Sequence, residues 1–298
     1  MKWVVEVKKR NSLIELYRFI FAINVIKGHD MFPYSGPYFG FGRISVEFFF
    51  ILTGFLLMGS IRKFLDKPFK EGFISFMISK IKGIWIPMVI AIPFNIVYSL
   101  LTKNDINMWG FLWYIKQMLI YFAIYFLIRY FIKDEKKFFV IVAITFVVAT
   151  ILNMFDTFYE RGDVRAAMGI SLGILISYIP KLNIKKKGLI WLFLAPIQSV
   201  VILILIFGNN FMMEKVLDLI LYPLLIYFTF QLDVRNKIFD YLGSLSFGLY
   251  AFQCVVRPFP FFGINNTWIL FGIIVMLSIL EDSLKRYLNY HKVKKATA

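Results

Sequence analysis

Ionisable side chains interrupt an apolar stretch near the N-terminus. Residues 15–30, ELYRFIFAINVIKGHD, include Glu15, Arg18, Lys27 and His29. Arg18 and His29 are eleven residues apart, about three turns of an α-helix, so a helix places them on one face. Charged groups at bilayer depth normally face a protein interior or a water-filled cavity. The spacing predicts that Arg18 and His29 either mark the two ends of one polar path or are anchored at opposite membrane interfaces.

A carboxylate also lies within the aromatic stretch 42–57, GRISVEFFFILTGFLL. Glu47 precedes Gly54 by seven residues, so the two share a helix face, and the glycine permits close approach of a neighbouring helix. A glutamate in such surroundings needs a partner, whether for catalysis or for a structural ion pair. The candidate partners are Arg43, Lys27 and His29.

The composition is that of an integral membrane protein. The 298 residues are 59% hydrophobic, with a mean hydropathy of +0.71. Basic loops that set membrane orientation explain the net charge of +16 better than nucleic acid does. Cys254, the one cysteine, excludes an intrachain disulfide, and the only two histidines, His29 and His291, argue against a metal site.

The apolar segments predict an all-α fold, a polytopic bundle of about ten transmembrane helices. If the N-terminus is cytoplasmic, 25 Lys and Arg residues fall in inner segments and 6 in outer ones. The positive-inside rule then places both termini in the cytoplasm. Glu15 and Arg18 interrupt the h-region of any signal peptide, so the first span is expected to be retained. The predicted spans are 13–30, 42–60, 84–101, 111–128, 138–155, 166–180, 188–207, 213–232, 243–257 and 266–284.

Taken together, the two motifs resemble the acyltransferase 3 family, membrane proteins that acylate extracytoplasmic glycans and lipids. The family pattern is an arginine, ten residues and a histidine in the first span, then roughly G-V-[DE]-x-F-F-x-[LI]-[ST]-G-F. The matching residues are Arg18, His29, Val46, Glu47, Phe49, Phe50, Thr53, Gly54 and Phe55. The resemblance covers nearly the whole chain, which predicts one domain over 1–298 without the soluble domain that some members carry.

Four later segments resemble the family in the same order. ISKIKGIWIP (78–87) has Lys80 and Lys82 where arginines are common, and FLWYIKQML (111–119) contains Trp113. RAAMGISLGILI begins with Arg165, and YLGSLSFGLYAFQ (241–253) contains Tyr250 and Gln253. Gln253 stands where the family usually has histidine, so a structural or substrate-orienting role is expected there.

The resemblance implies acyl transfer from cytoplasmic acyl-CoA, most often acetyl-CoA, to a glycan or lipid-linked sugar in the plasma membrane of a bacterium. His29 is the expected general base, since its pKa suits proton transfer at neutral pH, and Glu47 or Asp30 would orient it. Arg18, Lys80 and Lys82 would bind the donor, although Arg18 could instead pair with Glu15. Trp113, Arg165, Tyr250 and Gln253 are expected to contact the acceptor.

Two other functions fit the sequence less well. A transporter or flippase also uses buried charges and many spans, but its paired halves with broken helices are not evident here. A non-catalytic glycan or lipid receptor is favoured only by Gln253. For the acyltransferase, a covalent acyl-histidine intermediate and direct transfer both fit the residues.

Overall fold

The computed structural model describes residues 11–27, 42–103, 112–155, 161–183, 187–207 and 211–297. All regular secondary structure in these ranges is helical, which confirms the predicted all-α class. The α-helices are α1 (Ser12–Lys27), α2 (Gly42–Ile61), α3 (Phe69–Ile81), α4 (Trp85–Leu101), α5 (Trp113–Phe131), α6 (Glu135–Asn153), α8 (Gly162–Ser177), α9 (Ile190–Phe207), α10 (Phe211–Val216), α11 (Tyr222–Thr229), α12 (Lys237–Val256) and α13 (Thr267–Thr297).

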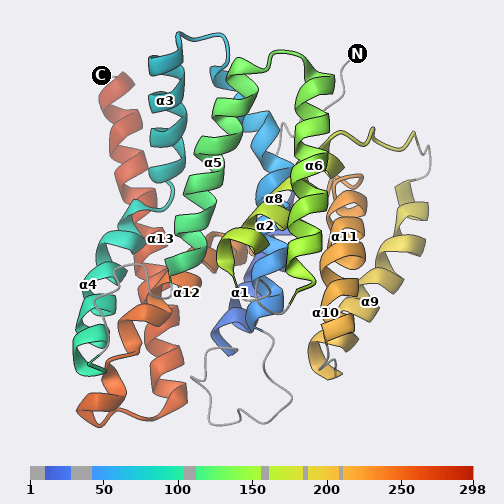
Figure 1. Ribbon diagram of the computed structural model, residues 1–298. Coiled ribbons are helices and arrows are strands. Elements are labelled where there is room, and N and C mark those ends of the chain that lie inside the picture. The colour runs from blue at the N-terminus through green and yellow to red at the C-terminus, as the bar shows by residue number, and fades with distance from the viewer. Residues whose placement is uncertain are drawn as a thin grey trace.

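The helices form one bundle with α2 and α8 in its middle. In Figure 1, α4 and α13 lie on one side of this pair, and α9, α10 and α11 lie on the other. Every predicted span overlaps a helix, and the predicted span 213–232 corresponds to α10, the π-helical segment Leu217–Leu221 and α11. The structure adds α3, a helix in the segment that the sequence assigned to an inner loop; its buried Gly72 and Phe76 pack it onto the bundle.

By length and composition, three helical segments of the described residues could cross a membrane: Ile44–Phe64, Lys187–Ile206 and Thr267–Leu288. A fourth crossing results if α3 and α4, which meet at 68°, form one broken span. Helices such as α1 and α8, with 16 residues each, are shorter than the roughly 20 residues that a full crossing needs. The predicted count of ten spans is therefore not established by these helices.

Side-chain caps begin several helices where the sequence offers Asn or Asp. Asn11 accepts from the backbone N–H of Leu13, 3.1 Å away, before α1. Asp134 accepts from Lys136 and Lys137 N–H groups at 2.7 and 3.1 Å before α6. These bonds satisfy N–H groups that the first turn of a helix leaves without a partner, and so fix where the helix starts.

Three polar contacts join segments that the sequence places at the inner side of the bundle. They link Ser12 to Asp240, Arg62 to Glu135 and Lys285 to Gly83. Each contact joins two segments that are far apart in sequence but carry the same predicted side. These contacts therefore agree with the predicted alternation of inner and outer segments along the chain. The cytoplasmic location of the end of the bundle that carries them stays a prediction.

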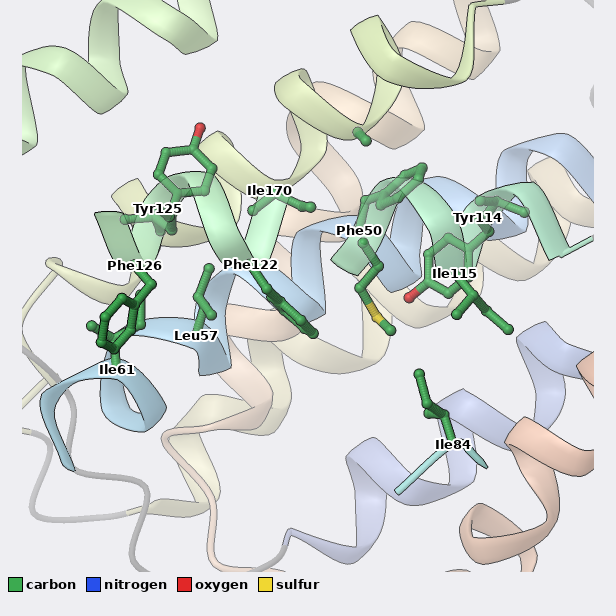
Figure 2. Packing of buried hydrophobic residues seen from close by; sticks show 14 of the residues in the cluster. Phe50, Leu57, Ile61, Ile84, Tyr114, Ile115, Phe122, Tyr125, Phe126 and Ile170 are labelled. Carbon is green, nitrogen blue, oxygen red and sulfur yellow. The ribbon is translucent and has the colours of Figure 1, made fainter. Parts of the chain in front are cut away.

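The largest apolar core lies between α2, α5 and α8. Figure 2 shows Phe50, Leu57 and Ile61 of α2 facing side chains of α5, with Ile170 of α8 close by. Aromatic rings dominate this core, and Phe50 and Tyr114 lie with ring centroids 4.7 Å apart. Such tightly packed rings hold the polar residues at the ends of these three helices in fixed positions.

Candidate functional site

Glycines bring α2 and α8 into backbone contact. A Cβ atom on Gly54 would lie 2.8 Å from the carbonyl carbon of Ile170, and one on Gly173 would lie 2.7 Å from the Phe55 nitrogen. A Cβ on Gly169 would lie 2.7 Å from the Cβ of Phe50. Larger residues at these positions would separate the helices, so the glycines set the distance across which side chains of α2 and α8 meet.

Glu47 and Arg165 form a buried ion pair across this interface. The Arg165 Nε donates to Glu47 Oε1 at 2.5 Å, and the residues are only 5% and 3% exposed. The guanidinium also lies over the Trp113 ring, 5.1 Å from its centroid. The observed partner of Glu47 is thus Arg165, which the sequence did not suggest. Of the expected partners, His29 and the side chains of Lys27 and Arg43 lie outside the described residues.

Three acceptor atoms around this pair lack hydrogen-bond partners in the part of the chain that the structure describes. They are Glu47 Oε2, Asn153 Oδ1 and Asp218 Oδ1, and all three are buried. Buried polar atoms are normally satisfied, so each such orphan needs an explanation. The residues around them enclose a cavity of about 10 Å³, the size of a single water position. Its lining is Ile44, Glu47, Asn153, Arg165, Glu214, Lys215 and Asp218.

A π-helical segment, Leu217–Leu221, brings Asp218 to this cavity. Isolated π turns within α-helices occur frequently at functional sites. Asp218 was not among the site residues expected from the sequence. The missed signal was a carboxylate inside an apolar span, which is costly unless it serves a function or is paired.

The first residues of α5 connect this centre with a second group of polar side chains. Trp113 faces Arg165, while the next residue, Tyr114, lies 3.3 Å from Thr53 through their hydroxyls. The ring of Tyr114 meets that of Tyr250 at 5.5 Å in a T-shaped contact. Expected site residues from α2, α5, α8 and α12 are therefore brought into one continuous region.

Arg18 forms the ion pair with Glu15 that the sequence left open as an alternative, with Nη1 and Oε2 2.8 Å apart. Its side chain is 30% exposed. Further along this face of α1, Ala22 and Val25 are fully buried in apolar clusters. On the face of α1 that follows Arg18, Ala22 and Val25 are therefore packed against neighbouring apolar side chains.

The remaining expected site residues differ in their surroundings. Gln253 is fully buried and donates to the Tyr250 carbonyl at 2.7 Å, but its Oε1 has no partner among the described residues. The Lys80 ammonium lies 4.9 Å from the Phe122 ring centroid, whereas Lys82 is exposed. The two lysines thus differ in exposure, and their role in donor binding stays a prediction. His29 lies outside the described residues.

At the start of α8, Arg161 holds the carboxylate of Asp163 through Nε and Nη2, at 3.1 and 2.5 Å. These hydrogen bonds to the guanidinium lower the pKa of Asp163. Asp163 therefore stays ionised in the first turn of α8, where a negative charge complements the helix dipole. Within the described ranges, no cluster of His, Cys, Asp and Glu side chains could hold a metal ion.

Comparison with known proteins identifies the family. The model of the acyltransferase 3 family, an acyltransferase domain, matches residues 11–280. The chain therefore belongs to the acyltransferase 3 family, as its motifs predicted. No curated protein and no solved structure matched. The family and the long apolar helices indicate a membrane protein with an acyltransferase role.

Proposed function

We propose that this protein is an O-acyltransferase that moves an acetyl group from cytoplasmic acetyl-CoA to a hydroxyl of a cell-surface or lipid-linked glycan. The observation that carries the proposal is the buried Glu47–Arg165 pair in a chain of the acyltransferase 3 family. One oxygen of Glu47 holds Arg165, and the other has no partner among the described residues. A half-satisfied carboxylate can orient a base or an acceptor hydroxyl.

In the proposed reaction, the oxygen of the acceptor hydroxyl attacks the thioester carbonyl while His29 takes the proton of that hydroxyl. The new C–O bond forms, the C–S bond breaks, and the proton passes from the imidazolium to the departing thiolate of CoA. Glu47 would balance the charge on the imidazolium. Arg165 would stabilise the negative charge that develops on the carbonyl oxygen, since its guanidinium is fixed by Glu47 and Trp113.

Arg18, Lys80 and Lys82 would hold the donor. The ion pair with Glu15 engages one nitrogen of the Arg18 guanidinium, and the remaining N–H groups suit a phosphate of CoA. Lys82 is exposed and can contact the donor only at the surface of the bundle. Trp113, Tyr250 and Gln253 would bind the acceptor, because aromatic faces and amide groups suit the apolar faces and hydroxyls of a sugar.

We further propose that the protein crosses the plasma membrane of a bacterium several times, with both termini in the cytoplasm. The unequal distribution of Lys and Arg supports this orientation. The contacts among predicted inner segments support it as well. The donor would then enter from the end that holds Arg18 and meet the acceptor near Glu47.

Mass analysis of surface glycans from cells with and without the protein tests the proposed function. We expect an added acetyl mass only when the protein is present. His29→Gln preserves size and hydrogen bonding but cannot act as the base at neutral pH, so its glycans should match those of cells that lack the protein. His291→Gln is the matched control and should retain acetylation. Unmodified glycans in every strain would instead support a transporter or receptor.

A further inference from the structure

A cavity of about 480 Å³ lies between α6 and the end of α8, and nothing in the proposed reaction uses it. Its volume falls within the range of about 300–1,000 Å³ that is typical of small-molecule sites. The walls are apolar, with polar groups from the start of α6 at one end. The lining residues are Glu135, Lys136, Phe139, Val140, Leu175, Tyr178, Ile179 and Pro180.

One residue of this lining has a polar group without a hydrogen-bond partner among the described residues. Tyr178 is 8% exposed, and its hydroxyl is buried without a hydrogen-bond partner among the described residues. It lies within electrostatic range of Glu135, Arg129 and Arg62, which form an ion-pair network at the same end of the bundle. The cavity therefore has an apolar body and a polar end, as an amphipathic ligand requires.

The apolar lining continues along the outer face of α6. Val140 is 53% exposed, and Ile144, Val147 and Ile151 follow it on the same helix face, each more than half exposed. In a membrane protein, such a stripe faces lipid chains. An acyl chain that enters the cavity can therefore extend along α6 without leaving an apolar surface.

Basic side chains surround the polar end. Lys133, Lys136 and Lys137 are exposed at the start of α6, and Lys181 is exposed directly after Pro180. The acidic residues of this region are already engaged, because Glu135 binds Arg62 and Asp134 caps α6. The uncompensated charge is thus positive. Anionic lipid headgroups attract such lysines, particularly in the cytoplasmic leaflet.

We propose that this cavity binds an anionic phospholipid. One acyl chain would lie between Phe139, Val140 and Ile179, and the headgroup would contact Lys136 and Lys181. Tyr178 would donate its hydroxyl proton to an ester or phosphate oxygen of the lipid. The site is separate from the Glu47–Arg165 pair, since the two share no lining residue.

Photo-crosslinking of the full chain in phosphatidylcholine nanodiscs tests the site. The probe is phosphatidylglycerol with a photoactivatable group on its acyl chain, added as a minor component, and peptide mapping locates the label. We expect label concentrated at 139–140 and 175–180. Val140→Trp and Ile179→Trp fill the cavity from exposed positions and should lower this labelling several-fold. Leu203→Trp on α9 is the control, because Leu203 and Val140 are equally exposed, at 53%.

A second pair of measurements tests the headgroup and identifies competing occupants. The same photoactivatable group on phosphatidylcholine should label the site less, and Lys136→Glu combined with Lys181→Glu should remove the preference for the anionic lipid. Tyr178→Phe should weaken labelling without filling the cavity. Label spread evenly over the exposed faces of α6, α9 and α13 would overturn the proposal. Displacement of the label by palmitoyl-CoA, but not by unlabelled phosphatidylglycerol, would also overturn it and assign the cavity to the donor.

Discussion

Two ionic clusters at opposite ends of the bundle use similar residues in different ways. At the predicted inner end, Arg129 Nη1 donates to the backbone carbonyls of Ile132 and Lys133, and Glu135 contacts both Arg129 and Arg62. These bonds fasten the connection between α5 and α6. Near the start of α2 and α8, the Glu47–Arg165 pair joins two helices and is almost completely buried.

The two clusters differ most in what they leave without a partner. The inner cluster leaves one donor, Arg129 Nε, among the described residues. The cluster around Glu47 leaves three acceptors, Glu47 Oε2, Asn153 Oδ1 and Asp218 Oδ1, beside a small cavity. Unsatisfied buried acceptors cost stability. Under the proposed function, these acceptors would receive hydrogen bonds from another molecule or hold a mobile proton, whereas the bonds of Arg129 stabilise the connection between α5 and α6.

The largest expected effect comes from the glycine contact that supports the Glu47–Arg165 pair. Gly54→Ala places a Cβ against the backbone of Ile170, so α2 and α8 must separate, and we expect loss of folded protein. Gly59→Ala is the control on the same helix, because a Cβ there meets nothing within 4 Å. It should be neutral or stabilising by about 0.5–1 kcal/mol. Thermal unfolding in detergent measures both, and equal melting temperatures would contradict the close packing.

The second prediction compares a buried ion pair with an exposed ion pair that has the same N–O separation. Glu47→Gln leaves the Arg165 charge buried, which we expect to cost about 3–5 kcal/mol of unfolding free energy and to abolish acyl transfer. Glu71→Gln removes the surface pair of Glu71 with Lys67, which has the same 2.5 Å separation but side chains 58% and 43% exposed. Its cost should be about 0–1 kcal/mol. Denaturant unfolding measures both variants. Similar losses of unfolding free energy would contradict the distinction between the buried and the exposed ion pair.

Asp218→Asn tests whether the orphaned acceptors serve function rather than stability. The change keeps the shape of the side chain but removes its charge and one acceptor. We expect transfer to fall by roughly 10- to 100-fold, equivalent to one charged hydrogen bond of about 1.5–3 kcal/mol, with little change in unfolding. Asp233→Asn, at an exposed position, serves as the control. A loss of stability without a loss of activity in Asp218→Asn would make Asp218 a structural residue.

The smallest effect is expected at the inner cluster. Arg62→Gln removes one partner of Glu135, but both side chains are about one-third exposed and Arg129 remains nearby. We expect a cost of about 0–1 kcal/mol and unchanged transfer. Paired measurements of unfolding and initial rate check this expectation. Loss of activity in a folded Arg62→Gln protein would show that the inner cluster also takes part in function.

The sequence predicted the helical class and most helix positions, because runs of apolar residues between polar turns are local signals. It also predicted that Glu47 and Gly54 share a helix face, and in the structure both contact α8, through Arg165 and Ile170. It could not predict that the partner of Glu47 lies 118 residues away, since sequence spacing carries no information about which helices become neighbours. Asp218 was missed although it is a carboxylate inside an apolar span. The sequence could not show that a π-helical segment between α10 and α11 brings it close to Glu47.

The account is tested most directly by purified protein in lipid vesicles, supplied with acetyl-CoA labelled in its acetyl group and a surface-glycan acceptor fraction. The measured quantity is label transferred to glycan per folded protein. We predict transfer by the wild type, His291→Gln and Glu71→Gln, and none above background by His29→Gln or Glu47→Gln. Transfer at the wild-type rate by folded His29→Gln or Glu47→Gln would contradict the proposed centre.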